Sequence, residues 1–469
     1  MSGDAGDTPT RIVILGSGPG GYVAALRAAR LGAAVTLVEK NLVGGVCLNW
    51  GCIPTKALLA STEALARARA GEEYGFAVAG EIRPDLPRMV ERKARIVTQM
   101  RRNIEVLLKK AKVELIRGVG RLAEDGSVLV YTGTETVVVR ADKIIIATGS
   151  EPALLPMFDF DHPAILTSTA ALELEQIPTS MLIVGAGAIG CEFASFFGAL
   201  GTQITMVEMM PQMLPMESKR LAKQFQSVYR KRGVQVLLQT KVESIVEYAG
   251  DRVVAKLSDG SEVTAEKILV SVGRKPNTAD LGLETVGVET DGRGYIVVNE
   301  YLETTARNIY AVGDVNGGLL LAHVASYEAF VAVDNCLGGR RMRDLRSTPS
   351  CTYSLPEVAS VGLNEEQAVE SGYQPVTGTC RFGALGKALA MGEDVGYVQL
   401  IADRDTDLVL GASMMGPHVT DVIHEVALAV QNGLTVKQLT DTIHAHPTIA
   451  EAILEAAHDV HGESVHVAR

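Results

Sequence analysis

Membrane-spanning segments, an export signal and an excess of basic residues are all missing from this sequence. No apolar stretch is long enough to cross a bilayer, and residues 1–10 lack the basic and apolar regions of a signal peptide. Lys and Arg number 44 against 55 Asp and Glu, and the net charge of −11 disfavours non-specific binding to nucleic acid. We therefore expect a cytoplasmic protein with no membrane or nucleic-acid partner, although a mature mitochondrial form without its transit peptide would look the same.

Cysteine and aromatic residues are also scarce, with six cysteines in 469 residues and an aromatic fraction of 5%. Without an export signal, static disulfides are disfavoured, because reducing compartments keep thiols open unless they cycle. The hydrophobic fraction of 47% is that of an ordinary globular protein. The length predicts about three or four domains with a sizeable core.

Two segments, 11–39 and 180–208, repeat one design: an apolar strand, a glycine-rich turn, an apolar helix and a second strand that ends in glutamate. The acid lies 23 residues after the first glycine in both, at Glu39 and at Glu208. This offset is near the roughly 20 residues expected of a dinucleotide-binding unit. The turns contain Gly16, Gly18 and Gly21 in the first segment and Gly185, Gly187 and Gly190 in the second.

Glycines in such turns let the backbone approach a pyrophosphate, and the helix N-terminus adds N–H donors and partial positive charge. Glu39 and Glu208 are expected to bind a ribose 2′-hydroxyl; the alternative for each is a solvated glutamate at a strand end. A carboxylate at Glu208 also repels a 2′-phosphate, and no arginine follows it directly. The second unit therefore favours NAD over NADP.

The rest of the chain divides by pattern. Each unit returns to an apolar strand that ends in glycine, and 308–314 again ends a strand with Gly313 and Asp314. The first unit carries an insertion with two amphipathic helical patterns, 54–70 and 87–112. From about Ser347 the pattern changes to short strands and helices, the last expected at 447–459, which predicts a separate α+β domain.

Cys47 and Cys52 are separated by four residues and lie among small, turn-prone residues, just behind the first glycine turn. Two thiols this close to a cofactor site are typical of a working redox pair. The alternatives are a structural bridge or two buried free thiols, and the first conflicts with a reducing compartment. The remaining four cysteines are expected to be small buried apolar residues, namely Cys191, Cys336, Cys351 and Cys380.

The segment from Gly44 to Lys56 resembles the active-site segment of the flavoprotein disulfide reductases, the pyridine nucleotide-disulfide oxidoreductase family, and the resemblance covers nearly the whole chain. Its wording, Cys-Leu-Asn-x-Gly-Cys-Ile-Pro-Thr-Lys, is most similar to members that oxidise dihydrolipoamide. The resemblance implies an α/β fold with two Rossmann-like dinucleotide-binding domains and a C-terminal α+β dimerisation domain. The implied domains are 1–150 for FAD, 151–279 for NAD, 280–347 as a central domain completing the FAD site, and 348–469 as the interface.

The resemblance also assigns roles that residue order alone leaves open. Cys47 becomes the thiol that faces substrate and Cys52 the thiol beside the flavin. His446 becomes the acid/base, with Glu451 as its orienting partner, and a helix that starts at Pro447 would lean Glu451 back toward His446. A capping box from Thr448 to Glu451 is the rival interpretation, and both roles could coexist.

Three further assignments follow. His444 and His446 as metal ligands are disfavoured because a third ligand is missing nearby, so no metal is expected. Lys56 and Glu192 match a lysine and a glutamate that pair near the flavin, the alternative being surface charges. The other residues assigned to cofactor binding, with Asp314 at the flavin's ribityl chain, are Thr148, Gly149, Gly273, Arg274, Gly313, Asp314, Ala322 and His323.

The implied activity is oxidation of protein-bound dihydrolipoamide with reduction of NAD⁺, in a 2-oxo acid dehydrogenase complex or the glycine cleavage system. A homodimer with shared active sites is implied, and the early first strand predicts that a partner carries the lipoyl group. The rivals are another flavin-dependent disulfide reductase and a non-catalytic FAD-binding interaction protein. The cysteine pair with a matching histidine disfavours the second. Missing C-terminal vicinal cysteines disfavour mercuric reductase, and Glu208 disfavours glutathione-type reductases.

Overall fold

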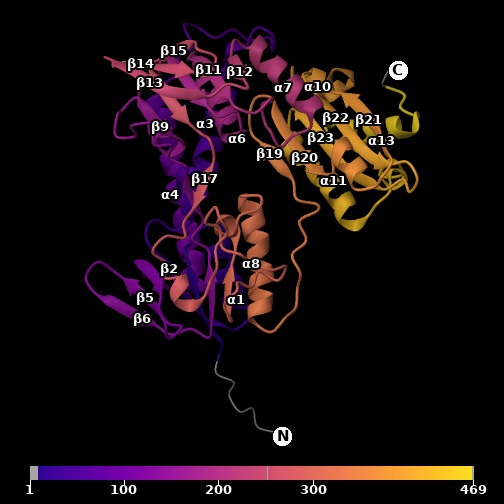
Figure 1. Ribbon diagram of the computed structural model, residues 1–469. Coiled ribbons are helices and arrows are strands. Elements are labelled where there is room, and N and C mark those ends of the chain that lie inside the picture. The colour runs from indigo at the N-terminus through magenta and orange to yellow at the C-terminus, as the bar shows by residue number, and fades with distance from the viewer. Residues whose placement is uncertain (1–8, 251, 467–469) are drawn as a thin grey trace. The chain divides into compact units, whose positions relative to one another are not determined.

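The computed structural model describes residues 9–250 and 252–466, which group into two compact units (Figure 1). The first unit joins residues of the expected FAD and central domains, and the second joins those of the expected NAD and interface domains. Residues 58–86 are the main exception, because they group with the second unit, and the boundaries also differ over 151–153, 273–279 and 345–347. The division into four domains itself stays a prediction. The first unit comprises the chain up to Ala57, Pro87–Ala153 and Gly273–Asp344; the second comprises Leu58–Leu86, Leu154–Val272 and the chain from Leu345.

A parallel five-stranded sheet forms the centre of the first unit. Its order is β18 (Ile309–Ala311), β7 (Lys143–Ile146), β1 (Arg11–Leu15), β2 (Ala34–Glu39) and β3 (Glu114–Arg117). Its central strands β7 and β1 are apolar and buried after their first residue, because both faces of the sheet are covered there. Ile12 and Ile14 of β1 pack into one core cluster, and Val13 and Leu15 pack into another.

Helices and a small sheet supply these two covers. In the first cluster, β1 packs with α1 (Pro19–Arg30), α8 (Ala322–Cys336) and part of α4 (Leu86–Lys110), and Figure 1 shows α1 and α8 side by side. The second cluster includes residues of an antiparallel sheet. That sheet consists of β4 (Val119–Leu122), β5 (Val128–Tyr131) and β6 (Thr136–Val139). The short helix α2 (Gly45–Trp50) and then α3 (Cys52–Arg69) follow β2.

The second unit repeats the parallel sheet. Its order is β12 (Gln235–Leu238), β11 (Gln203–Glu208), β10 (Ser180–Val184), β16 (Lys267–Val270) and β9 (Ile165–Thr167). Leu182 and Val184 share a core cluster with residues of a second antiparallel sheet. The accompanying elements are α5 (Ser168–Ala171), α6 (Ala188–Leu200), α7 (Lys219–Lys231), β13 (Val242–Ala249), β14 (Arg252–Leu257) and β15 (Glu262–Ala265).

An antiparallel sheet forms the C-terminal part of the second unit, in the order β19 (Ser350–Thr352), β20 (Glu357–Gly362), β23 (Val409–Gly416), β22 (Tyr397–Asp403) and β21 (Pro375–Arg381). Every residue of β22 and β23 is buried. Helix α11 packs on β20 and β23, and α13 packs on β21 and β22. The helices of this part are α9 (Glu365–Glu370), α10 (Gly386–Ala390), α11 (Val419–Asn432), α12 (Val436–Thr440) and α13 (Glu451–His461).

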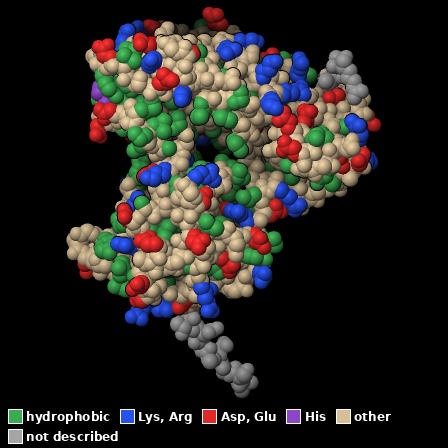
Figure 2. Space-filling view, viewed as in Figure 1, with side chains coloured by type: hydrophobic (Ala, Val, Ile, Leu, Met, Phe, Trp, Pro, Cys, Tyr) green, Lys and Arg blue, Asp and Glu red, His purple; other side chains and the backbone are tan. Residues whose placement is uncertain are grey.

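The fold class predicted from the sequence is confirmed: the chain has two parallel sheets of the kind found in dinucleotide-binding domains and a C-terminal α+β part. In the described part of the chain, none of the helices is both long and apolar enough to cross a bilayer. Acidic and basic side chains lie interspersed on the face that Figure 2 shows, which is the mixed surface of an ordinary globular protein.

Candidate active site

The glycine turn after β1 is built by close contacts that only glycine permits. Gly16 has φ +93°, and a Cβ there would lie 2.4 Å from the carbonyl oxygen of Ala147. A Cβ on Gly21 would lie 1.8 Å from the carbonyl oxygen of Gly16. At Gly18, by contrast, the nearest atom is 3.9 Å away, so the backbone there is open to a ligand. This arrangement fits a pyrophosphate held against the N-terminus of α1.

The turn after β10 repeats this construction. Gly185 has φ +101°, and a Cβ there would meet the carbonyl oxygen of Ser271 at 2.5 Å. A Cβ on Gly190 would meet the carbonyl oxygen of Gly185 at 2.1 Å, whereas no atom lies within 4 Å of a Cβ on Gly187. Two glycines therefore serve packing and the middle one leaves space, as a second dinucleotide site requires.

The two strand-end acids are buried and bonded to their own turns. Glu39 and Glu208 are each 7% exposed, so the alternative of a solvated glutamate is wrong. Oε2 of Glu39 accepts from the amide and the hydroxyl of Ser17, at 2.8 and 2.6 Å, and Oε2 of Glu208 accepts from the amide of Ala186 at 2.8 Å. The other oxygen of each acid accepts from the amide two residues further along. Each carboxylate is thus fixed beside the glycine turn; its bond to a ribose stays a prediction.

The cysteine pair lies directly beside the first glycine turn. The amide of Gly44 donates to the carbonyl of Ser17 at 3.0 Å, and a Cβ on Gly45 would lie only 2.5 Å from Cα of Gly18. Helix α2 therefore starts against this turn, with Cys47 inside it and Cys52 as the first residue of α3. The tertiary contact joins the two motifs that the sequence places in succession.

Cys47 and Cys52 are both partly exposed and unbridged in this structure. The hydrogen bond with Cys52, followed by burial and the charge of Cys52, raises the pKa of the Cys47 thiol, and the nearby Lys56 ammonium opposes that shift. Two thiols so close titrate as a pair, because an ionised neighbour disfavours a second negative charge. The pair therefore suits a form that carries one thiolate and one thiol.

The other cysteines match the sequence prediction with one exception. Cys191, Cys336 and Cys380 are buried, and burial raises the pKa of the Cys191 thiol. Cys351 is only partly buried, because it lies on β19 at the edge of the C-terminal sheet. It is thus the natural control cysteine for the pair.

His446 and Glu451 form the contact expected of them, although the helix starts later than predicted. Nδ1 of His446 lies 2.9 Å from Oε1 of Glu451. Helix α13 begins at Glu451 and not at Pro447, because side chains hold the preceding turn: the amide of Thr448 donates to Oε2 of Glu451, and its hydroxyl donates to the carbonyl of Ala445. Glu451 therefore orients the histidine and also caps the turn, which combines the two rival interpretations.

The electrostatics of this contact are asymmetric. The side chain of His446 is 79% exposed and that of Glu451 is 22% exposed. Burial opposes ionisation of Glu451, but the hydrogen bonds from the Thr448 amide and from His446 outweigh it and lower the pKa of the carboxyl. The ionised carboxylate of Glu451, which the Thr448 amide fixes in place, therefore orients the exposed imidazole of His446.

His444 cannot share a metal with His446 in this conformation. Its Nε2 lies 2.8 Å from Oε1 of Glu425 and its Nδ1 lies 2.9 Å from the carbonyl oxygen of Thr442, so both ring nitrogens are engaged. Over residues 9–250 and 252–466, no three His, Cys, Asp or Glu side chains form a metal-binding group. The interpretation of the two histidines as metal ligands therefore has no geometric support.

Asp314 lies in a turn, η2 (Gly313–Asn316), that a buried acid supports from behind. Oε2 of Glu328 accepts from the amide of Gly313 at 2.7 Å and from the side-chain amide of Asn316 at 3.0 Å. Arg343 pairs with the other oxygen of Glu328 at 2.7 Å. Sequence reasoning missed Glu328, whose signal was an acid in the middle of the largely apolar helix α8.

The remaining predicted residues are distributed over both units. Lys56 lies on α3 in the first unit, whereas Glu192 lies on α6 in the second, is 6% exposed and accepts from the amide of Tyr353 at 3.0 Å. Glu192 is therefore no surface charge, and its ion pair with Lys56 stays a prediction. Ala322 and His323 start α8. Arg274 is the first residue of one strand of a two-stranded ribbon in the first unit, and Thr148, Gly149 and Gly273 directly precede the strands of this ribbon.

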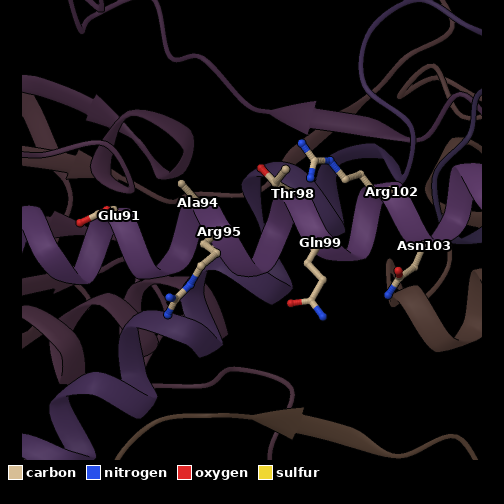
Figure 3. A pocket seen from close by; sticks show the side chains of 7 residues that line it. All are labelled: Glu91, Ala94, Arg95, Thr98, Gln99, Arg102 and Asn103. Carbon is tan, nitrogen blue, oxygen red and sulfur yellow. The ribbon is translucent and has the colours of Figure 1, made fainter.

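A surface hollow of about 550 Å³ lies elsewhere, along α4 (Figure 3). All its lining residues come from that one helix, and none belongs to the predicted site. It is therefore a groove on a polar helix face and not the reaction centre. Its lining residues are Glu91, Ala94, Arg95, Thr98, Gln99, Arg102 and Asn103.

Comparison with known families agrees with this geometry. Residues 10–329 match the model of the pyridine nucleotide-disulphide oxidoreductases, and residues 348–457 match the dimerisation domain of that family. The first match contains both glycine turns and the cysteine pair, and the second contains His446 and Glu451.

Known proteins similar along their whole length carry related names. A dihydrolipoyl dehydrogenase of Bacillus subtilis is 42% identical over 97% of this chain and 98% of its own, and one of Chlorobaculum tepidum is 42% identical over 96% of each. Among solved structures, LpdA of Mycobacterium tuberculosis is 30% identical, with a TM-score of 0.91 over 96% of this chain and 99% of its own. The Cu(II) complex of the HOCl-induced flavoprotein disulfide reductase RclA of Escherichia coli is also 30% identical, with a TM-score of 0.87 over the same shares.

Proposed function

The chain belongs to the pyridine nucleotide-disulphide oxidoreductase family, and on that premise we propose that it oxidises dihydrolipoamide to lipoamide and reduces NAD⁺. The observation that carries the proposal is the placement of Cys47 and Cys52 against the first glycine turn. Relatives named dihydrolipoyl dehydrogenase, about 40% identical over nearly the whole chain, support the same reaction.

The glycine turns support two cofactors. FAD is assigned to the first turn, which adjoins the cysteines, and NAD to the second, where Glu208 disfavours a 2′-phosphate. When bound, these cofactors would accept the two electrons of the reduced cysteine pair, and the electrons would leave the protein on NADH. The open backbone at Gly18 and Gly187 would hold the pyrophosphates of the two cofactors, and other residues of the chain handle sulfur and protons.

The thiol chemistry starts from the oxidised cysteine pair. A substrate thiolate attacks Sγ of Cys47, the Cys47–Cys52 bond breaks, and Cys52 leaves as a thiolate. The second substrate thiol then attacks the substrate sulfur of the mixed disulfide, so that lipoamide forms and Cys47 is released. Two protons leave the substrate in this exchange, and we assign their handling to His446 with Glu451. The choice of Cys47 as the attacked sulfur follows the family resemblance.

Two aspects of assembly belong to the same proposal. The match to the family's dimerisation domain supports a homodimer. The exposed imidazole of His446 lies within that matched region, and we assign it to the thiol pair of a second copy of the chain. The substrate thiols are assigned to a lipoyl group on a partner protein.

The thiol count of the protein tests the proposal. The chain has six cysteines, so the oxidised protein should show four titratable thiols after denaturation and six after treatment with dihydrolipoamide and removal of excess reagent. Addition of NAD⁺ to the reduced protein should return the count to four while NADH appears.

Cys351→Ser is the matched control, because it removes a partly buried cysteine outside the pair. It should lower both counts by one and leave NADH formation unchanged, whereas Cys47→Ser should show the same count before and after treatment and form no NADH. Six thiols in the untreated, aerobically purified wild type would contradict a cycling disulfide.

A further inference from the structure

The chain passes between its two units at a short antiparallel ribbon in the first unit. It leaves through β8 (Ser150–Pro152) and returns through β17 (Arg274–Pro276), with Arg274 opposite Pro152 and Pro276 opposite Ser150. The chain is also held together at one end of the ribbon, where Thr148, before β8, and Asn277, after β17, exchange two hydrogen bonds of 2.7 and 2.9 Å. The ribbon therefore has a defined geometry.

The side chain of Arg274 is not free in solvent but forms two hydrogen bonds with Ser150. Its Nε donates to Oγ of Ser150 at 2.6 Å, and its Nη2 donates to the carbonyl oxygen of Ser150 at 2.7 Å. The Ser150 hydroxyl donates in turn to Oδ2 of Asp314, and Nε of Arg274 lies 3.5 Å from the same oxygen. A chain of charge-assisted hydrogen bonds therefore runs from the ribbon to Asp314.

The groups that make these bonds are largely shielded from solvent, and their contacts with Asp314 go to one carboxylate oxygen. Ser150 is 2% exposed, and the side chains of Arg274 and Asp314 are 15% and 22% exposed. Both contacts go to Oδ2, and Oδ1 accepts no hydrogen bond from residues 9–250 and 252–466. The carboxylate is thus held in one rotation, with one oxygen left for a ligand.

We propose that Arg274 and Ser150 are positioning residues of the FAD site, which orient Asp314 so that its free oxygen accepts a hydrogen bond from the cofactor. The inference rests on the proposed function, which assigns FAD to this unit. Arg274 follows the last strands of the NAD unit in sequence, yet its contacts are with residues of the unit to which FAD is assigned. Neither residue needs to touch FAD itself.

Removal of the guanidinium should weaken FAD binding through Asp314. Residues that orient a ligating group typically contribute about 10- to 100-fold to affinity, so Arg274→Met should raise the Kd for FAD by that order. Arg274→Lys should lie between, because it keeps the charge but loses the fork of donors. Ser150→Ala should also weaken binding, since it removes the hydroxyl that bridges to Oδ2.

The experiment titrates FAD into apoprotein and follows the quenching of flavin fluorescence, with the melting temperature of each apoprotein measured in parallel. Lys275→Met is the matched control, because Lys275 is the exposed neighbour on the same strand and should leave the Kd unchanged. The decisive comparison is made in an Asp314→Asn background, where Arg274→Met should add little further loss because both act on one carboxylate.

Two results would overturn the positioning role: a Kd within about twofold of wild type for both Arg274→Met and Ser150→Ala, or an equal loss for Arg274→Met in the Asp314→Asn background. If Arg274→Met fails to fold, Arg274→Lys and Ser150→Ala carry the same comparison. A wild type that binds no FAD would instead contradict the proposed function, which separates the two failures.

Discussion

Nδ1 of His446 lies 2.9 Å from Oε1 of Glu451, and the imidazole is exposed while the carboxylate is anchored by the amide of Thr448. With Nδ1 bonded to the carboxylate, Nε2 is the ring nitrogen left to exchange a proton. The His446–Glu451 pair therefore exposes Nε2 of the imidazole on the surface of its own chain, which suits a site completed by a second subunit.

His446→Ala should lower dihydrolipoamide oxidation by about 10²- to 10⁴-fold, the usual contribution of a positioned acid/base. NADH-dependent reduction of an artificial electron acceptor should survive, because that half of the reaction needs no thiol proton transfer. Steady-state assays of both reactions check this, with His424→Ala on α11 as the control, since His424 is an exposed histidine outside the site.

Mixed dimers of His446→Ala and Cys47→Ser subunits should recover about a quarter of wild-type activity. About half of randomly re-formed dimers are hybrids, and each hybrid assembles one complete site from two chains. Activity is measured after subunit exchange has been verified by mass spectrometry of differently tagged chains. A mixture that stays inactive would show that the sites are not shared.

Glu208→Gln should erode the preference for NAD⁺, because it removes the negative charge beside the second glycine turn. We expect the ratio of kcat/KM for NAD⁺ to that for NADP⁺ to fall by about tenfold or more, which corresponds to about 1.4 kcal/mol. Glu243→Gln, an exposed acid on β13 of the same unit, should leave the ratio unchanged. Equal use of both nucleotides by the wild type would refute the role of Glu208.

Gly187→Ala and Gly190→Ala should separate binding from packing within one turn. A Cβ at Gly187 meets no atom within 4 Å, so the apoprotein should keep its melting temperature while NADH binding weakens about tenfold through the blocked backbone. A Cβ at Gly190 would lie 2.1 Å from the carbonyl oxygen of Gly185, so Gly190→Ala should destabilise the fold by about 1–3 kcal/mol or more. Calorimetry of the apoproteins and NADH titrations distinguish the two effects.

The His444–Glu425 pair should stabilise the protein only at lower pH. The hydrogen bond that His444 makes to the Glu425 carboxylate raises the pKa of His444 against the opposing effect of burial. A raised pKa in the folded state gives stability that is complete below the unfolded value of about 6.5 and is lost as pH rises through the folded value. Glu425→Gln should therefore lower Tm at pH 6 by about 1–3 °C and by much less at pH 9.

Scanning calorimetry at both pH values checks this prediction. Glu370→Gln, an exposed acid on α9, should change Tm little at either pH. A loss that is equal at pH 6 and pH 9 would mean that Glu425 stabilises the fold by another route.

Local patterns were predicted correctly where neighbouring residues decide the structure. The two repeated segments have the predicted bounds, because β1 and β10 start at Arg11 and Ser180 and the returning strands β2 and β11 end at Glu39 and Glu208. Both glycine turns follow their strands as expected. Their chemistry is local, because a tight turn, a helix start and the returning acid all fall within about 25 residues. The start of α13 was wrong, since side-chain bonds of Thr448 replaced the main-chain bonds of a first helical turn.

The amino-acid sequence by itself determined the two nucleotide turns, the thiol pair and the histidine with its acid, because each is a short pattern with one chemical purpose. Only the tertiary structure decided how distant segments support them. One carboxylate oxygen of Asp314 contacts both Ser150 and Arg274, although more than a hundred residues separate these two in the sequence. Glu328, a buried residue of helix α8, supports the turn that contains Asp314. Such contacts depend on how sheets and helices pack, which no local pattern encodes.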